Sequence, residues 1–231
     1  MIYIGIDDTD VAGSERGTGR LAREIAAALS PRFDVRGVTR HQFLVDPRIP
    51  YTSHNSGAAI HLRANGPEDL DALAHEVAGL MRAAFQPGSD PGLCVARDVP
   101  AAITAWGRRI QAEVVTQAEA RDLAAAHRLP LLGLGGTEDG VIGAPASVGL
   151  AATGDDGRWV LVGRSRDLTG AVPVAAVLRA GVDEVRTSDG APVREGLVDT
   201  QGKLRPALRG GRVVLFVAQS ADGVWRALKV G

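Results

Sequence analysis

A short apolar run that ends in a cluster of acids is the feature that most constrains how this chain can fold. Residues 1–6 are apolar or small, and Asp7, Asp8, Thr9 and Asp10 follow them at once. The run is rich in β-branched residues, which predicts a buried strand. Ligands of α/β proteins gather where strands end, so we expect these acids at a ligand site.

The acidic cluster itself favours a metal-dependent site. Three carboxylates within four residues repel one another unless a cation or hydrogen-bond donors compensate them. Mg²⁺ does so economically, because proteins hold it with one or two carboxylates plus the phosphates of a substrate. We therefore expect Asp7, Asp8 and Asp10 to be catalytic residues and metal ligands, with Thr9 beside a bound phosphate. The alternative is a solvated turn, since Asp and Thr are common turn residues.

Bulk composition narrows the class of protein. The chain has 231 residues, 45% hydrophobic and 23% charged, which fits a globular protein of one large or two small domains. Its net charge of −1 gives no overall basic field to attract nucleic acid, although a local basic patch stays open. No stretch is apolar for long enough to span a membrane, and no secretory signal is visible. With its single cysteine, Cys94, the chain is expected in the cytoplasm.

Strands and helices alternate along the sequence. Apolar periodicity predicts helices at residues 20–29, 67–85, 100–110, 116–127 and 174–180, and strands at 1–6, 35–44, 58–62, 93–96, 159–162, 183–186, 213–218 and 224–230. Residues 187–211 are expected to form a long loop, and the turn at 221–223 predicts a hairpin between the last two strands. The interleaved order predicts an α/β or α+β fold with mixed sheets.

Two glycine-rich stretches are candidates for phosphate binding. Residues 11–19 lead into a helix whose first N–H groups can receive an anion, and Gly17 is the phosphate-binding candidate there. Residues 133–149 have a glycine density that lets backbone N–H groups approach a phosphate, which singles out Gly140 and Gly143. A surface loop followed by a tightly packed helix of small residues is the alternative there.

Three polar residues between positions 40 and 55 are further candidates. Arg40 and Arg48 carry planar guanidinium groups suited to phosphate, and exposed ion pairs are their alternative role. Asn55 lies in a polar loop that also carries Tyr51 and His54, a composition typical of binding loops. A local backbone role in the turn is the alternative for Asn55.

Taken in order, these stretches resemble the archaeal tRNA-isoleucine agmatinylcytidine synthetase family. The similarity runs through residues 5–10 and then through 16–22, where Thr18 matches a threonine that is phosphorylated in the family. The resemblance therefore makes Thr18 a candidate catalytic residue, and a helix N-cap is its alternative role. It continues through Arg40, residues 47–52 with Asn55 and Gly57, residues 90–92 and 139–144, and Arg164, which stands where the family has Tyr-Arg. Six ordered matches are much more specific than any single short motif.

The resemblance implies a kinase-like α/β domain together with a ferredoxin-like α+β domain. We assign these to residues 1–130 and 131–231, with insertion of the second into the first as the alternative. It also implies cleavage of ATP, phosphorylation of a cytidine base and displacement of the phosphate by agmatine. Phosphoryl transfer needs a metal bridging the phosphates and donors for the developing charge, for which Arg40, Arg48 and Arg164 are the cationic candidates.

The sequence departs from the family at several points. The OB-fold and zinc ribbon that hold tRNA in the family are not expected, because the sequence ends at Gly231 and lacks cysteine pairs. Thr52 follows Tyr51 without the family's lysine, and Asp139 replaces an arginine. The three tryptophans are scattered and form no stacking stripe for single-stranded RNA.

These departures weaken the case for tRNA while leaving nucleotide and metal chemistry in place. We expect an Mg²⁺-dependent, ATP-using phosphotransferase or ligase-like enzyme that acts on a small molecule or a nucleoside. Two alternatives stay open: tRNA wobble-cytidine modification with an RNA-binding module from a partner chain, and a non-catalytic nucleotide-binding regulatory module. The sequence indicates no oligomeric state.

Overall fold

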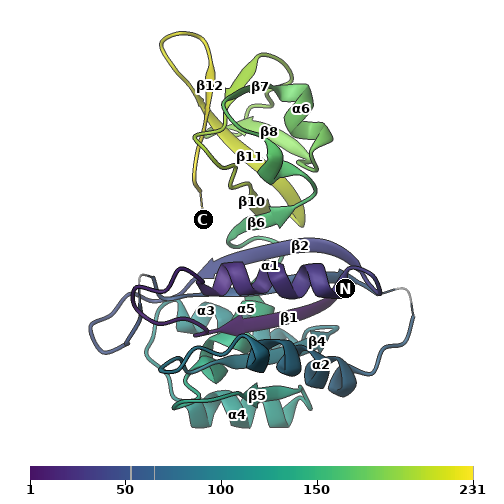
Figure 1. Cartoon of the computed structure of the whole chain (residues 1–231). Helices are drawn as coiled ribbons and strands as arrows, with labels where there is room; N and C mark the ends of the chain where they lie inside the picture. Colours follow the sequence, from purple (N-terminus) through teal and green to yellow (C-terminus); the bar gives the residue numbers. More distant parts are fainter. Residues whose placement is uncertain (53, 65, 231) are drawn as a thin grey trace. The chain divides into compact units, whose positions relative to one another are not determined.

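The chain forms two compact units, each of which is described here by itself. A computed structural model describes residues 1–52, 54–64 and 66–230, and the units span Met1–Thr153 and Gly154–Gly231 (Figure 1). The expected mixed α/β class is confirmed. The boundary lies at Thr153 and not at residue 130, because the two elements after residue 130 complete the sheet of the first unit and cover one of its faces.

The first unit is built on a five-stranded antiparallel sheet. Its strand order is β5 (Leu131–Gly133), β4 (Gly92–Arg97), β1 (Ile2–Asp7), β3 (Ser56–Arg63) and β2 (Asp34–Gln42). Its helices are α1 (Thr18–Leu29), α2 (Leu70–Ala83), α3 (Ala101–Ile110), α4 (Gln117–Ala126) and α5 (Gly140–Ala152). The acidic end of β1 therefore lies on a strand with a partner on either side.

Residues 2–97 have the ferredoxin-like arrangement. The elements follow in the order β1-α1-β2-β3-α2-β4, and the four strands lie in the order β4-β1-β3-β2. We expected this arrangement in residues 131–231, and the structure has it at the other end of the chain. The misassignment has a physical cause: strand order depends on pairing between distant segments, which local periodicity does not report.

The two faces of the sheet are covered by different helices. Side chains alternate between the faces of a strand, so Ile2, Ile4 and Ile6 lie on one face and Gly5 lies on the other. The isoleucine face carries α1 and α2 (Figure 1), and all three isoleucines are fully buried. The Gly5 face carries α5, which approaches so closely that a Cβ at Gly5 would overlap the Ala144 carbonyl oxygen.

Glycines in residues 133–149 serve this close packing. Residues 140–152 form α5, and a Cβ at Gly140 would lie 2.7 Å from the Asp7 carbonyl oxygen. Most of this stretch is therefore helix and not loop, while phosphate binding by Gly140 and Gly143 stays a prediction. The alternative, a helix of small residues packed tightly on the sheet, is confirmed. Helix α5 can lie this close because its side chains are small and nearly all of them are buried.

The second unit is a strand-rich module with one short α-helix among its described residues. Its main path of strands is β6 (Arg158–Val162), β10 (Ala207–Arg209), β11 (Arg212–Gln219), β12 (Trp225–Ala227), β9 (Leu197–Asp199) and β7 (Ala171–Pro173), and β8 (Glu184–Thr187) pairs with β11 in parallel. The 3₁₀ turn η1 (Ser165–Asp167) and α6 (Val174–Arg179) connect strands. The expected hairpin of β11 and β12 is confirmed. The expected loop at 187–211 is wrong in part, because it contains β9 and β10.

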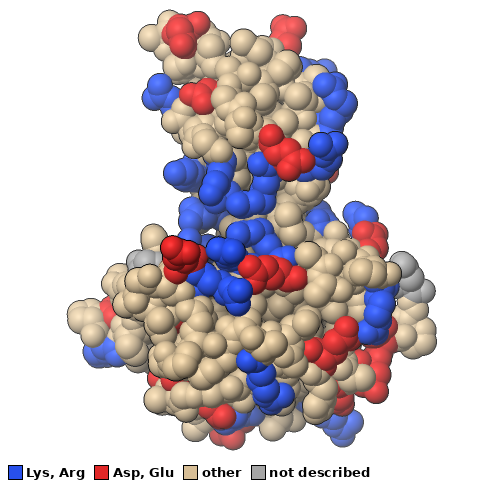
Figure 2. Space-filling view, viewed as in Figure 1, with Lys and Arg blue, Asp and Glu red and all other residues tan. Residues whose placement is uncertain are grey.

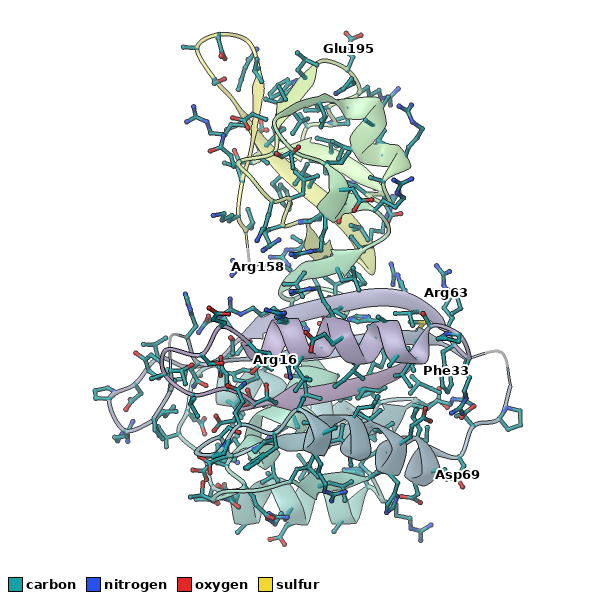
Figure 3. The ribbon with its side chains drawn as sticks, viewed as in Figure 1. Arg16, Phe33, Arg63, Asp69, Arg158 and Glu195 are labelled. Carbon is teal, nitrogen blue, oxygen red and sulfur yellow. The ribbon has the colours of Figure 1, made fainter. Side chains whose placement is uncertain are left out.

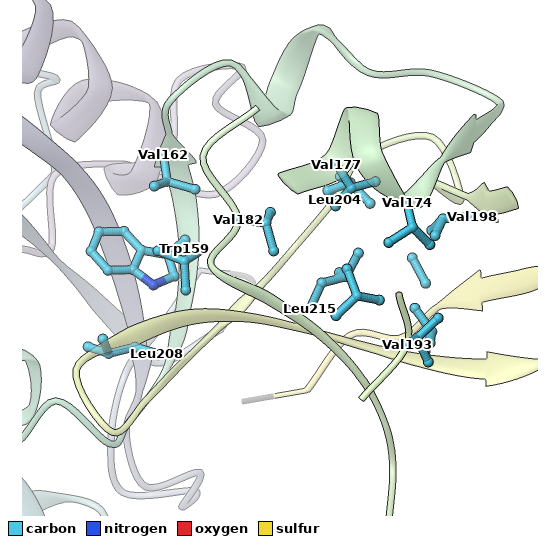
Figure 4. Packing of buried hydrophobic residues seen from close by; sticks show 14 residues of the cluster. Trp159, Val162, Val174, Val177, Val182, Val193, Val198, Leu204, Leu208 and Leu215 are labelled. Carbon is cyan, nitrogen blue, oxygen red and sulfur yellow. The ribbon is translucent and has the colours of Figure 1, made fainter. Parts of the chain in front are cut away.

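The second unit has its own hydrophobic core. Trp159 of β6 packs with valines and leucines from β8, β11 and α6, among them Val177 and Leu215 (Figure 4). These three side chains are 1% exposed or less. Across the described residues, no helix combines the length and the apolar character needed to cross a membrane.

Candidate active site

A cavity of about 220 Å³ opens beside the acidic end of β1. Four segments of the first unit meet there: the end of β1, the connection from β2 to β3, the end of α3 with the residues after it, and the start of α5. Its walls combine carboxylates with apolar side chains. The lining residues are Asp7, Asp8, Phe43, Arg48, Ile49, Pro50, Asn55, Ile110, Glu113, Val114, Val115, Asp139, Ile142 and Gly143.

Asp7 is the innermost acid of the β1 end. Its carboxylate lies against Gly143 of α5, where a Cβ would be only 2.6 Å from Asp7 Cγ and 2.7 Å from Phe43 Cε2. Burial raises the pKa of Asp7 to about 8, and the charges of Asp8 and Asp10 add to the rise. Asp7 therefore occupies a space that exists because residue 143 lacks a side chain.

Asp8 follows in an unusual backbone conformation. Its φ of 52° lies in the left-handed region, which Asp tolerates better than most residues. Burial raises the pKa of Asp8 to about 6, and the nearby charges of Asp90, Asp10 and Asp139 raise it further. The carboxylates at this end of the sheet thus disfavour one another's ionised forms.

This mutual repulsion makes the site suited to a cation. Asp7 and Asp8 both line the cavity, and their oxygens are the donors that Mg²⁺ prefers. Asp10 does not line it and instead accepts a hydrogen bond from Thr52 Oγ1 (3.4 Å). Within the described ranges, no group of three or more His, Cys, Asp or Glu side chains is arranged to hold a metal. A bound Mg²⁺ would have Asp7 and Asp8 as ligands, with phosphate and water supplying the rest.

Thr9, Gly17 and Thr18 meet where the acidic loop enters α1. Thr9 Oγ1 donates to Thr18 Oγ1 at 3.1 Å, and Thr9 is only 3% exposed. Gly17 is the N-cap of α1 and Thr18 its first residue, so the alternative role of Thr18 as N-cap is wrong. A Cβ at Gly17 would lie 3.0 Å from Asp10 Oδ2, which brings this helix start close to the acids.

Of the two arginines expected at the site from this part of the sequence, Arg48 lines the cavity and Arg40 does not. Arg48 lines the cavity and donates from Nε and Nη2 to the Asp46 carboxylate at 2.8 Å each. This pairing lowers the pKa of Asp46 to about 2. Arg40 Nε donates to Ser56 Oγ at 2.8 Å, and its charge counters the burial that raises the pKa of Asp10.

Asn55 has both of the roles weighed from the sequence. It lines the cavity, while its Nδ2 donates to the Leu44 carbonyl oxygen at 2.7 Å. Two expected phosphate contacts lie elsewhere. The Gly140 N–H donates to the Asp90 carbonyl oxygen at 2.8 Å, so it is already used within the fold. Arg164 belongs to the second unit, where its 85% exposed side chain pairs with Asp167.

Several residues that reach the acidic loop were not singled out from the sequence. Glu113 and Asp139 line the cavity with Asp7 and Asp8, which gives it four carboxylates. Gln86 and Asp90 lie outside it but bond to the backbone that carries Asp8 and Thr9. The family match at residues 90–92 was the one available signal for this connection.

Comparison with solved structures shows a likeness of fold. The chain is 24% identical to a tRNA fluorescent labeling enzyme over 64% of its own length, with a TM-score of 0.54. It is 23% identical to TiaS, a tRNAIle2 agmatidine synthetase, whose structure was solved in a complex with tRNA(Ile2) and ATP. That match covers 64% of this chain, with a TM-score of 0.55. The chain is 22% identical to TiaS in a complex with tRNA(Ile2), AMPCPP and agmatine (64%, TM-score 0.52).

The likeness has clear bounds. This chain covers 35 to 36% of the chains in those structures, so it spans about a third of their length. No family model matches the sequence, and no curated protein matches it. At this level of identity, the comparison establishes the fold, and any function has to be argued from the site.

Proposed function

We propose that the first unit contains the active site of an Mg²⁺-dependent, ATP-using transferase or ligase-like enzyme. The observation that carries the proposal is the cavity at the end of β1, where Asp7 and Asp8 meet Arg48, Asn55 and Gly143. Asp7 and Asp8 would hold Mg²⁺, which would neutralise phosphate charge. Arg48, with Arg40 near Asp10, would orient the phosphates. The likeness to proteins solved with ATP and AMPCPP supports this use of the fold.

We propose that the cavity takes a small cationic acceptor and not the whole nucleotide. Its volume of about 220 Å³ is below the roughly 300–1,000 Å³ of most ligand pockets, so it has room for only a small group. Besides the proposed metal ligands Asp7 and Asp8, two further carboxylates, those of Glu113 and Asp139, line it. An amine or guanidine on an apolar stem would match both the acids and the walls formed by Phe43 and Ile142. The agmatine in one of the similar structures is a molecule of this kind.

Steady-state ATP turnover tests the proposal. We expect Mg²⁺-dependent turnover that requires an added diamine or agmatine, and we expect Asp8→Asn to abolish it while the fold remains intact. Asp34→Asn is the matched control, because Asp34 begins β2 at the end of the sheet remote from Gln42 and the cavity loop. Wild-type turnover in Asp8→Asn would remove the acidic cluster from the mechanism. Stabilisation by Mg²⁺ and ATP without turnover would instead favour a regulatory nucleotide-binding module.

A second candidate is action on RNA, with tRNA as the polymer to test. The observation that favours it is a charge difference: residues 1–153 carry 14 Lys and Arg against 18 Asp and Glu, whereas residues 154–231 carry 12 against 9. The net charges are therefore −4 and +3, and Figure 2 shows the blue Arg and Lys side chains of the second unit. Phosphate contacts make such binding steeply salt-dependent. Binding of tRNA that weakens strongly with salt would support this candidate, and no binding at low salt would exclude it.

A further inference from the structure

The acidic loop between β1 and α1 is held by a segment far away in sequence. Residues 84–91 connect α2 to β4, and their polar groups bond to the loop on both sides of its acids. Figure 3 shows Arg16 on this loop in front of the sheet. The connection lines no part of the cavity, so any effect it has on the site must pass through the loop.

Gln86 makes most of these bonds. Its Nε2 donates to the carbonyl oxygens of Thr9 (3.1 Å) and Arg16 (2.9 Å), while its Oε1 accepts from Ser14 Oγ (2.5 Å). One side-chain amide thus fastens the start, the middle and the end of the loop. Because the loop begins at Asp8 and ends at Gly17, the same amide is bonded directly after Asp8 and directly before Gly17.

The strained peptide at Asp8 explains why such fastening matters. A non-glycine residue in the left-handed region costs about 1–3 kcal/mol and persists only where the surroundings hold it. The Asp90 N–H donates to the Asp8 carbonyl oxygen (3.1 Å), and Gln86 donates to the next carbonyl, that of Thr9. These two bonds hold consecutive carbonyls, and so they determine where the Asp8 side chain points.

We infer that Gln86 is a positioning residue for the acidic site. It acts through the Thr9, Ser14 and Arg16 contacts to keep Asp8 in place for a divalent cation and its phosphate ligand. The inference rests on the proposed function as far as the ligand is concerned. Its structural part, that Gln86 orders the loop, stands on the hydrogen bonds alone.

Two substitutions separate hydrogen bonding from packing. Gln86→Met keeps the length of the side chain and removes all three bonds. Gln86→Glu keeps the acceptor for Ser14 but turns both donors into an oxygen that faces two carbonyls. We expect amide hydrogen exchange in residues 10–17 to rise at least about tenfold in Gln86→Met, because the loop loses three hydrogen bonds. The rise should be larger in Gln86→Glu.

The binding measurement uses calorimetric titration with Mg²⁺ and ATP. We expect the Kd to rise by about tenfold in Gln86→Met, and we expect saturating ligand to restore slow exchange in the loop, because the ligand then orders the acids itself. A purely structural role would lower the melting temperature without this rescue. Gln219→Met is the matched control, since Gln219 is exposed at the end of β11 in the second unit.

The outcomes are distinguishable. Loop exchange that stays at the wild-type rate in both Gln86 variants would overturn the inference. Faster loop exchange with an unchanged Kd would also overturn it, because the loop would then not position the site. A wild-type protein that binds no Mg²⁺ and ATP would contradict the proposed function and remove the ligand from the inference, while the exchange result would still decide whether Gln86 orders the loop. Ser14→Ala, which removes the bond to Gln86 Oε1 together with the bonds between Ser14 Oγ and the Arg16 backbone, should change loop exchange in the same direction.

Discussion

Replacement of Gly143 by alanine tests whether Asp7 depends on the space that this glycine leaves. The new Cβ would overlap Asp7 Oδ2 and lie 2.6 Å from Asp7 Cγ, whereas ordinary contact begins at 3.4 Å. The Asp7 carboxylate must therefore move by about 0.8 Å at its carbon and by more at Oδ2, and Phe43 Cε2 by about 0.7 Å, or α5 must shift. A misplacement of this size in a catalytic constellation costs roughly tenfold to a hundredfold.

The stability of this variant should change little. Overpacking typically costs about 1–3 kcal/mol, but the atoms that must move belong to the Asp7 and Phe43 side chains and not to the backbone, and alanine is favoured over glycine in a helix by about 1 kcal/mol. We therefore expect a free energy of unfolding within about 2 kcal/mol of the wild-type value. Urea unfolding measures it, and calorimetric titration with ATP measures affinity with and without Mg²⁺.

The refuting result is an unchanged affinity in the presence of Mg²⁺. If Gly143→Ala binds Mg²⁺ and ATP as tightly as the wild type does, Asp7 does not need its present place, and the metal assignment fails. The affinity for ATP in the absence of Mg²⁺ should change less, because the Asp7 carboxylate then has no metal ion to bind. Gly79→Ala in α2 is the matched control: no atom lies within 4 Å of the added Cβ, so it should gain about 1 kcal/mol of stability and bind normally.

Three further outcomes are expected. Gly5→Ala should destabilise the protein by about 3 kcal/mol or more in urea unfolding, since the new Cβ overlaps the Ala144 carbonyl oxygen and neither backbone can yield easily; a loss below about 1 kcal/mol would contradict the packing of α5 on β1. Burial holds the pKa of His61 well below its ordinary value, and the charges of His41 and Arg36 lower it further. As the pH falls below about 6.5, the His61 imidazole therefore binds a proton only in the unfolded chain. Stability should then fall by up to about 1.4 kcal/mol per pH unit, and His61→Gln should flatten this slope; an equally steep slope in the variant would refute the assignment. Glu113→Gln should raise the KM for a cationic acceptor several-fold at unchanged ATP affinity; equal KM values would remove Glu113 from the acceptor site.

Sequence reasoning found the regular elements whose signals are local. The helices expected at 20–29 and 67–85 form as α1 and α2 with ends shifted by two or three residues. Strong apolar stripes define both, and Asp69 caps the second by accepting bonds from the N–H groups of Asp71 and Ala72. The three-residue strands β5, β7, β9 and β10 were missed, because three residues are too few to show a period of two.

The candidate site was predictable only in part. Asp7, Asp8, Arg48, Asn55 and Gly143 were singled out from the sequence and do line one cavity. These residues lie in short motifs in which a few consecutive residues carry the acidic, cationic, amide or glycine groups that indicate a binding site. Their roles as metal and phosphate ligands stay predictions, as do those of Asp10, Thr18, Arg40 and Arg164.

The rest of the site is created by tertiary contacts. Gln86 bonds to Thr9 and Arg16 across 77 and 70 positions of sequence, and no local pattern distinguishes it from any other glutamine near a turn. Glu113 and Asp139 join the cavity only because α3 and α5 bring their ends to the same edge of the sheet. Such a cluster can be inferred only once strand order and helix packing are known.

Paramagnetic NMR with Mn²⁺ in place of Mg²⁺ tests the central claim most directly. Mn²⁺ accepts the same oxygen ligands as Mg²⁺ and broadens the amide signals of residues near it. In the presence of ATP, we expect substoichiometric Mn²⁺ to broaden first the signals of Asp8 and Gly143, which line the same cavity, and to leave those of α6 sharp. Broadening that spares Asp8 and Gly143, or that begins elsewhere in the chain, would contradict a metal–nucleotide site at the end of β1.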